Sequence, residues 1–240
     1  MGSRSGAGTR VRSIVKLSVF SLLMVLTSSL LFTASSPLIR VSPFESEVAN
    51  TYLSYLLSAF PVACLALLLT FVFAGRIRLG YLNLRRTGTL RPFFAQPQGG
   101  RWESDGLYFG LVMMAIVGTV TYFQFAPGGF AFQWSTLALV ILFSAANAFT
   151  EEVIFRLPYV TMGANETGSR LYGRVMGSLV FGVQHFWGAA PNGFIGAVMA
   201  ALTGYVLAKS MQETRGFFWA LMIHFMLDLP IFLWMLNQAP

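Results

Sequence analysis

Charged side chains are scarce in this sequence. Only 10% of its 240 residues are Asp, Glu, Lys or Arg, whereas soluble domains average about 25%. Hydrophobic residues make up 55% of the chain and form long uncharged stretches from end to end. A soluble domain of this size has no core large enough to bury all of them, so the composition predicts a membrane protein.

Cysteine is nearly absent as well. The single Cys64 excludes a disulfide framework within one chain. It stands between Ala63 and Leu65 with no base beside it, so we interpret it as a buried side chain that fills space in the core rather than as a nucleophile. The net charge of +7 does not indicate nucleic-acid binding, because the basic residues lie in short loops between apolar runs. We expect no nucleic-acid partner.

Long apolar runs are abundant, and a membrane-crossing helix needs about 20 such residues. Between 175 and 209 the apolar run is too long for one span, and Pro191 and Asn192-Gly193 interrupt it, which predicts a tight helical hairpin. We therefore expect an all-α polytopic helical bundle with about seven spans. They cover residues 14–34, 48–75, 106–126, 132–161, 175–189, 193–209 and 216–236.

The basic residues predict the orientation of the bundle. With seven spans, 14 of the 16 Lys and Arg residues fall on one side, Arg40 alone falls on the other, and Arg156 lies within a span. Cytoplasmic loops carry such an excess, so the N-terminus is predicted to be cytoplasmic. We divide the chain into residues 1–130, with three spans and a basic cytoplasmic loop, and a four-helix catalytic core at 131–240. The loop at 76–104 is expected to touch anionic lipid headgroups.

The first apolar run has a second interpretation. A basic start, an apolar stretch and the small residues Thr33-Ala34-Ser35-Ser36 also fit a cleavable signal peptide. Cleavage there would leave the following residues outside, so the topology of the later spans would not change.

Six ionisable residues remain in or near the predicted spans once the others are assigned to loops: Glu151, Glu152, Arg156, His185, His224 and Asp228. A charged side chain at the centre of a membrane helix costs about 2.5–3.5 kcal/mol, so these groups must face one another or a wet cavity. Four-residue spacing places Glu152 with Arg156, and His224 with Asp228, on shared helix faces. We expect the groups to meet in the cytoplasmic half of the bundle, with the depth of His185 the least certain.

This set of side chains suits hydrolysis. A carboxylate beside an imidazole can activate water as a general base, and the same groups could ligate zinc through nitrogen and oxygen. The sequence contains no G-x-S-x-G elbow and no H-E-x-x-H helix. Each residue also has a plainer interpretation, as a structural ion pair, a polar contact between helices or a proton relay. A transporter would keep similar buried groups.

The motifs resemble those of one known family. Glu151-Glu152-Val153-Ile154-Phe155-Arg156 resembles the EExxxR motif of the CAAX prenyl protease and bacteriocin-processing family. The segments Phe181–His185 and His224–Asp228 resemble its FxxxH and HxxxN/D motifs. The resemblance covers residues 140–230, with the three motifs in order on separate spans.

The resemblance implies an intramembrane endopeptidase with a cavity open to the cytosol and to lipid. Carried over by motif, Glu151 would be the general base and His185 would help hold the water. Glu152 would orient the site through Arg156, and His224 would stabilise the oxyanion with Asp228 beside it. The implied partners are the lipid bilayer and a peptide or protein substrate at the membrane, and the implied location is the plasma membrane of a bacterial cell.

Two positions depart from the usual pattern of the family. Leu157 and Pro158 stand where a glycine often follows the motif arginine, and Pro158 should bend or end the helix. Asp228 stands where Asn is common, and an ionised Asp cannot donate to an oxyanion. This raises the case for a divalent metal such as zinc, with ligands drawn from Glu151, His185, His224 and Asp228, although no cofactor is required by the sequence.

Two other functions remain open at this point. The chain could be a non-proteolytic scaffold that regulates a membrane partner such as a sensor kinase, with the motif residues used in packing. A transporter would instead show ion-coupled flux in liposomes. The sequence does not identify the substrate.

Overall fold

The structure is a computed structural model that describes residues 4–31, 37–74, 80–92, 99–164, 170–188 and 190–238. It is 78% helical. The helices are α1 (Arg4–Ser29), α2 (Glu47–Ala74), α3 (Trp102–Phe125), α4 (Leu137–Phe155), α5 (Leu157–Met162), α6 (Arg170–His185), α7 (Gly193–Thr214) and α8 (Phe218–Leu236), with 3₁₀ turns at Ala126–Gly128 and Trp134–Thr136. The proposed cleavage segment, residues 33–36, lies outside the described residues.

The predicted all-α polytopic bundle is confirmed. In the described ranges, six helical segments are long and apolar enough to cross a membrane, and they include α1, α2, α3, α4 with α5, α7 and α8. The span predicted at 175–189 is α6, which has only 16 residues, shorter than the roughly 20 that a span needs.

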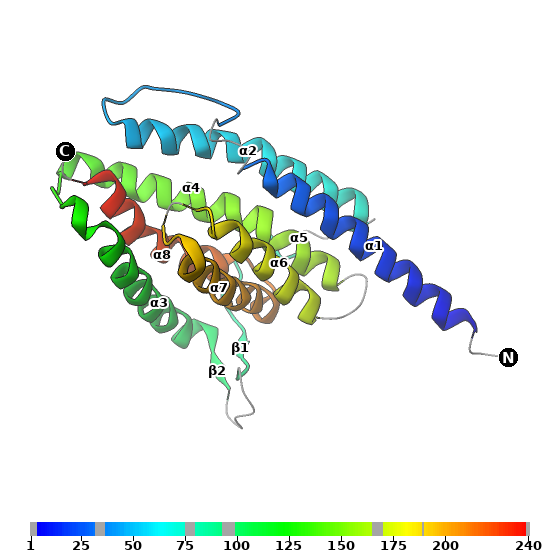
Figure 1. Cartoon of the computed structure of the whole chain (residues 1–240). Helices are drawn as coiled ribbons and strands as arrows, with labels where there is room; N and C mark the ends of the chain where they lie inside the picture. The colour runs from blue at the N-terminus through cyan, green and yellow to red at the C-terminus, as the bar shows by residue number, and fades with distance from the viewer. Residues whose placement is uncertain are drawn as a thin grey trace.

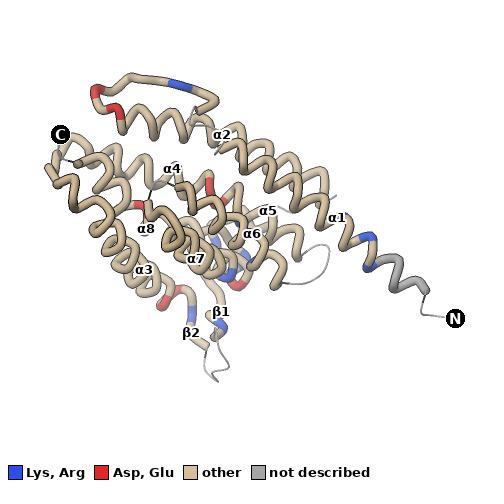
Figure 2. The backbone as a smooth tube through the Cα atoms, in the orientation of Figure 1, with Lys and Arg blue, Asp and Glu red and all other residues tan. Residues whose placement is uncertain are grey.

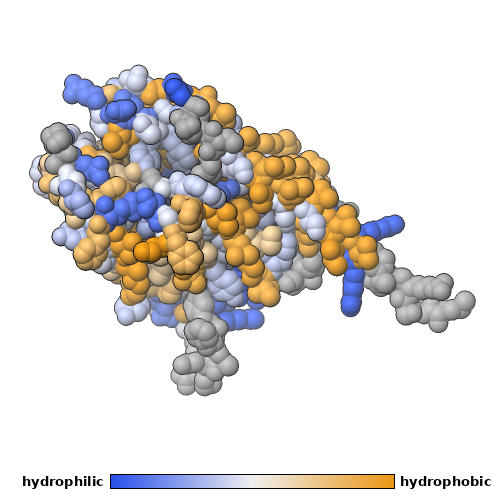
Figure 3. Space-filling model, in the orientation of Figure 1, coloured by the Kyte–Doolittle hydropathy of each residue, from blue (hydrophilic) through white to orange (hydrophobic). Residues whose placement is uncertain are grey.

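Apolar side chains cover the outside of the bundle. Leu68, Phe71 and Val72 of α2 are more than half exposed, and Figure 3 shows hydrophobic surface along α1 and α2. Such a surface is stable when lipid covers it. Cys64 is exposed on α2 as well, so the prediction that it is buried is wrong: period 3.6 places it on the lipid-facing side of the helix.

The core contains the hairpin of α6 and α7 and the helix α8, which has neighbours on two sides (Figure 1). Helices α6 and α7 form the predicted hairpin, α8 packs against both α3 and α4, and α2 lies along α4. Gly182 of α6 allows close packing, since a Cβ there would lie 2.7 Å from the carbonyl oxygen of Ala197 in α7. Of the helices that carry the motifs, α4 packs along α8, and α6 reaches α8 through the rings of Phe181 and His224, whose centroids are 5.8 Å apart.

Basic residues and a small hairpin mark one end of the bundle. The strands β1 (Thr89–Leu90) and β2 (Gly100–Arg101) pair antiparallel beside the starts of α3 and α8 (Figures 1 and 2). Glu213 at the end of α7 connects this hairpin to the bundle: it accepts hydrogen bonds from the backbone N–H of Arg91, just after β1, at 3.3 Å and from Trp102 Nε1 at 3.0 Å, and it pairs with Lys209 at 2.7 Å. We call this the basic end, and the end where α8 finishes the opposite end.

Candidate active site

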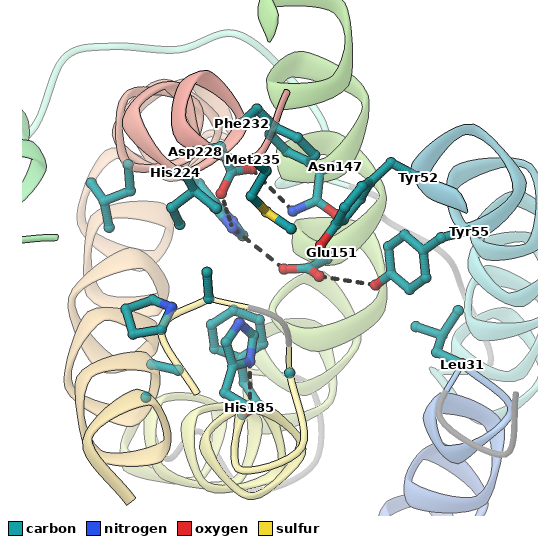
Figure 4. A pocket seen from close by; sticks show the side chains of 18 of the residues that line it. Leu31, Tyr52, Tyr55, Asn147, Glu151, His185, His224, Asp228, Phe232 and Met235 are labelled. Carbon is teal, nitrogen blue, oxygen red and sulfur yellow. Dashed lines mark hydrogen bonds and ion pairs between the residues drawn. The ribbon is translucent and has the colours of Figure 1, made fainter. Parts of the chain in front are cut away.

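A cavity of about 440 Å³ lies among the helices that carry the motifs (Figure 4). Glu151 of α4, His185 of α6, and His224 and Asp228 of α8 line it. Glu152 and Arg156 do not line it and are fully buried. The structure therefore gathers all six of these residues at one site, with four of them on the surface of the cavity.

Glu151 and Glu152 project from α4 in different directions, as adjacent helical residues must. Glu151 faces the cavity, where its Oε1 accepts a hydrogen bond from the Tyr55 hydroxyl of α2 at 3.1 Å. Glu152 Oε1 lies 3.4 Å from Arg156 Nε, which confirms the predicted pair. Only Glu151 is thus placed to touch a substrate or a water in the cavity.

His224 lies between the two glutamates. Its Nδ1 is 2.7 Å from Glu152 Oε1, while its Nε2 is 3.4 Å from Glu151 Oε2 and 3.7 Å from Asp228 Oδ1. The first distance is a short hydrogen bond, and the other two exceed the usual N–H···O range of 2.7–3.2 Å. Glu152 therefore orients the ring, and Nε2 remains on the cavity side with only these two longer contacts.

Asp228 is held from α4 as well as from its own helix. Asn147 Nδ2 donates to Asp228 Oδ2 at 3.0 Å. Asn147 lies one helical turn before Glu151, so both residues of α4 face the cavity. This contact leaves one carboxylate oxygen of Asp228 toward His224.

His185 occupies the other side of the cavity (Figure 4). Its Nδ1 lies 3.0 Å from the carbonyl oxygen of Phe181, one turn earlier in α6, and its ring packs on that of Phe181. Among the described residues it makes no hydrogen bond or ion pair with an acidic side chain. Because Nδ1 is used within the helix, Nε2 is the atom available to the cavity.

Arg156 lies on the side of the site that is nearer the basic end. Its guanidinium lies 3.6 Å from the centre of the Phe181 ring, a cation–π contact. Helix α4 ends at Phe155 and α5 begins at Leu157, with Pro158 in the first turn of α5, so the predicted break is confirmed. Arg156 thus lies at the junction between α4 and α5, one helical turn after Glu152.

The residues do not fit a metal centre in this arrangement. Within the described ranges, no three His, Cys, Asp or Glu side chains are grouped so that they could hold a metal ion. We therefore assign no step of the chemistry to a metal.

Two site residues were missed from the sequence, Tyr55 and Asn147. Asn147 could have been found by looking for polar residues one turn from Glu151 on the same face. Tyr55 carried no such signal, because nothing in the sequence indicates that α2 packs beside α4.

The cavity does not lie where the motifs led us to expect. Its lining includes Leu31 just after α1, Thr51 near the start of α2, Pro191 before α7 and Met235 near the end of α8. The last three belong to segments at the opposite end of the bundle, whereas α1 ends beside the middle of α2 (Figure 1). The cavity therefore extends away from the basic end, whereas the resemblance implied an opening to the cytosol.

Comparison with known proteins supports the family. Residues 132–230 match the model of the Rce1-like family, described as type II CAAX prenyl endopeptidase Rce1-like. No curated protein and no solved structure gives a significant match. The matched segment contains all three motifs and spans α4 to most of α8, so the predicted resemblance is confirmed over this part of the chain.

Proposed function

Since residues 132–230 carry the sequence pattern of CAAX-type intramembrane endopeptidases, we propose that this chain hydrolyses a peptide bond within the membrane. The substrate is a membrane-associated peptide or protein. The location is the plasma membrane of a bacterial cell, with the N-terminus in the cytoplasm. The observation that carries the proposal is the position of His224, between Glu151 and Glu152 at the buried end of the cavity.

In the proposed reaction, Glu151 is the general base. Its carboxylate faces the cavity, and a water between Glu151 and His185 would lose a proton to it while attacking the scissile carbonyl. The Tyr55 hydroxyl holds the carboxylate in place through its hydrogen bond. After attack, the proton on Glu151 can pass to the leaving amine, so the carboxylate is regenerated.

His224 is the proposed electrophilic group. Its Nε2 faces the cavity, 3.4 Å from Glu151 Oε2 and 3.7 Å from Asp228 Oδ1, and these long contacts leave it able to donate to the oxygen that becomes negative as the carbonyl is attacked. Glu152 acts through His224 as a positioning residue, because its bond to Nδ1 fixes the ring. Asp228 and Asn147 limit movement of the same ring from the side.

The test compares cells that carry the wild-type chain with cells that carry Glu151→Gln at equal abundance. Membrane and released peptides are analysed by mass spectrometry. Glu45→Gln is the matched control, because Glu45 is exposed in the loop before α2. A cleavage product present with wild type and Glu45→Gln, and absent with Glu151→Gln, is the expected result. If deletion of the gene has a phenotype that Glu151→Gln rescues, the chain is a scaffold and not a protease.

A further inference from the structure

The cavity is open at one end of the bundle and closed at the other. At the opposite end it is lined by exposed residues: Trp187 is 69% exposed, and Thr51 is exposed as well. These residues come from the turn after α6 and from the first turns of α2. The lining there thus continues onto the surface of the protein.

Toward the basic end the path is blocked by packed side chains. Below Glu151 and His224 lie residues that are at most 2% exposed: Phe155, Leu157, Tyr159, Met162, Leu207 and Phe217. They belong to one hydrophobic cluster. The buried guanidinium of Arg156 fills the space between this cluster and Phe181. Because protein interiors are packed as densely as crystals, this layer leaves no room for a polypeptide to pass.

The charge distribution assigns the open end to a side of the membrane. The loops at the basic end hold nearly all of the Lys and Arg residues, while the loop between α1 and α2 at the opposite end holds Arg40 alone. Lys and Arg collect on the cytoplasmic side. The open end of the cavity therefore faces away from the cytoplasm.

The lining also indicates what enters. Among the described residues that line the cavity, the acidic ones are Glu151 and Asp228, and no Lys or Arg is present. A free terminal carboxylate would find no Lys or Arg there and would face two acidic groups, beside imidazoles that already lie near carboxylates or backbone. Apolar residues form much of the lining, among them Leu31, Phe232 and Met235. The cavity suits an internal, apolar stretch of a peptide.

We propose that the catalytic cavity receives an apolar peptide segment from the non-cytoplasmic side of the membrane, between the first turns of α2 and the α6–α7 turn. The substrate is then a peptide during or after export, or the non-cytoplasmic part of a membrane protein. This inference rests on the proposed protease function for the reaction, but the direction of access rests on the geometry and charge described above.

The test uses single cysteines in the full-length chain with Cys64 replaced by Ser. Thr51→Cys places a thiol at the open end and Met199→Cys places one inside the cavity, since both residues line it. Thr87→Cys is the matched control, because Thr87 is exposed at the basic end just before β1. A membrane-impermeant thiol reagent is applied to intact spheroplasts and to inverted membrane vesicles.

We expect Thr51→Cys and Met199→Cys to be labelled in spheroplasts, and Thr87→Cys only in inverted vesicles. Labelling of Thr51→Cys should also block formation of the cleavage product identified with wild type. The proposal is overturned if Met199→Cys reacts from the same face as Thr87→Cys, or if it reacts from neither face. Labelling does not depend on catalysis, so a chain labelled as expected that yields no cleavage product would refute the protease function and leave the direction of access intact.

Discussion

Nδ1 of His224 lies 2.7 Å from Oε1 of Glu152, although the two residues are 72 positions apart in the sequence. The same carboxylate oxygen lies 3.4 Å from Arg156 Nε. Glu152 is thus shared between a cation on its own helix and an imidazole on α8. One buried carboxylate links the first motif to the third, and the orientation of His224 depends on a residue that does not line the cavity.

A double-mutant cycle tests this shared role of Glu152. Glu152→Gln leaves the Arg156 guanidinium buried without its carboxylate, and Arg156→Met leaves the carboxylate without its cation. Breaking a buried pair from one side costs about 3–5 kcal/mol. The double variant loses both charges together, so we expect it to be destabilised by less than the sum of the single effects. Unfolding of the purified protein in detergent measures all three free energies.

Glu45→Gln is the control for this cycle, because Glu45 is exposed and its replacement should leave stability unchanged. If the two single effects add to within about 0.5 kcal/mol of the double effect, the residues are not energetically coupled. The pairing of Glu152 with Arg156 would then contribute nothing to the site.

Tyr55→Phe should reduce catalysis without unfolding the protein. The change removes the hydroxyl that donates to Glu151 at 3.1 Å and keeps the ring. A hydrogen bond to a charged group contributes about 1.5–3 kcal/mol, so we expect kcat to fall roughly 10- to 100-fold. KM should change less, because the lost hydrogen bond holds the general base Glu151 and does not bind the substrate. The measurement is cleavage kinetics on the identified substrate.

The control for Tyr55→Phe is Tyr108→Phe, since Tyr108 is 72% exposed on α3. An equal loss of activity in both variants would mean that the hydroxyl of Tyr55 has no special relation to the base. A fall in kcat confined to Tyr55→Phe would support its role in positioning Glu151.

Asp228→Asn should retain most of the activity, whereas Asp228→Ala should lose it. An Asn side chain keeps an oxygen that can accept the hydrogen bond from Asn147 and a shape that supports the His224 ring. We expect rates within about tenfold of wild type for Asn, and a loss of about 100-fold for Ala through misplacement of His224. If the Asn and Ala variants are equally inactive, the charge of Asp228 is itself required.

The sequence predicted the helices and the motif residues well, because both are encoded locally. Apolar runs of sufficient length place the spans, and four-residue spacing places Glu152 with Arg156. Pro158 predicted the break between α4 and α5 for an equally local reason, since proline cannot continue the hydrogen bonding of a helix.

The parts that could not be predicted depend on how the helices pack. The contact of Tyr55 with Glu151 requires α2 to lie along α4, and hydrophobic periodicity gives the buried face of a helix but not its neighbour. The direction of the cavity has a similar origin. It follows from the dense packing of α5 at the basic end, where Leu157, Tyr159 and Met162 are fully buried.

Gly182→Ala tests whether the close packing of α6 and α7 places His185. A Cβ at position 182 would lie 2.7 Å from the carbonyl oxygen of Ala197 and 2.8 Å from the Cβ of Ala201. Both contacts are too short to keep, so the helices must move apart. Such overpacking costs about 1–3 kcal/mol. We expect a lower melting temperature and a loss of cleavage, because His185 lies three residues further along α6.

Gly118→Ala is the matched control for this prediction. Gly118 lies within α3, and a Cβ there would meet Pro230 at an ordinary 3.4 Å. The added methyl group should be neutral or should stabilise the helix by about 0.5–1 kcal/mol, because alanine loses less conformational entropy than glycine on folding. If both substitutions leave the melting temperature and the cleavage rate unchanged, the hairpin can widen freely. The position of His185 would then have to be set by the contact of its ring with Phe181 and not by the spacing of α6 and α7.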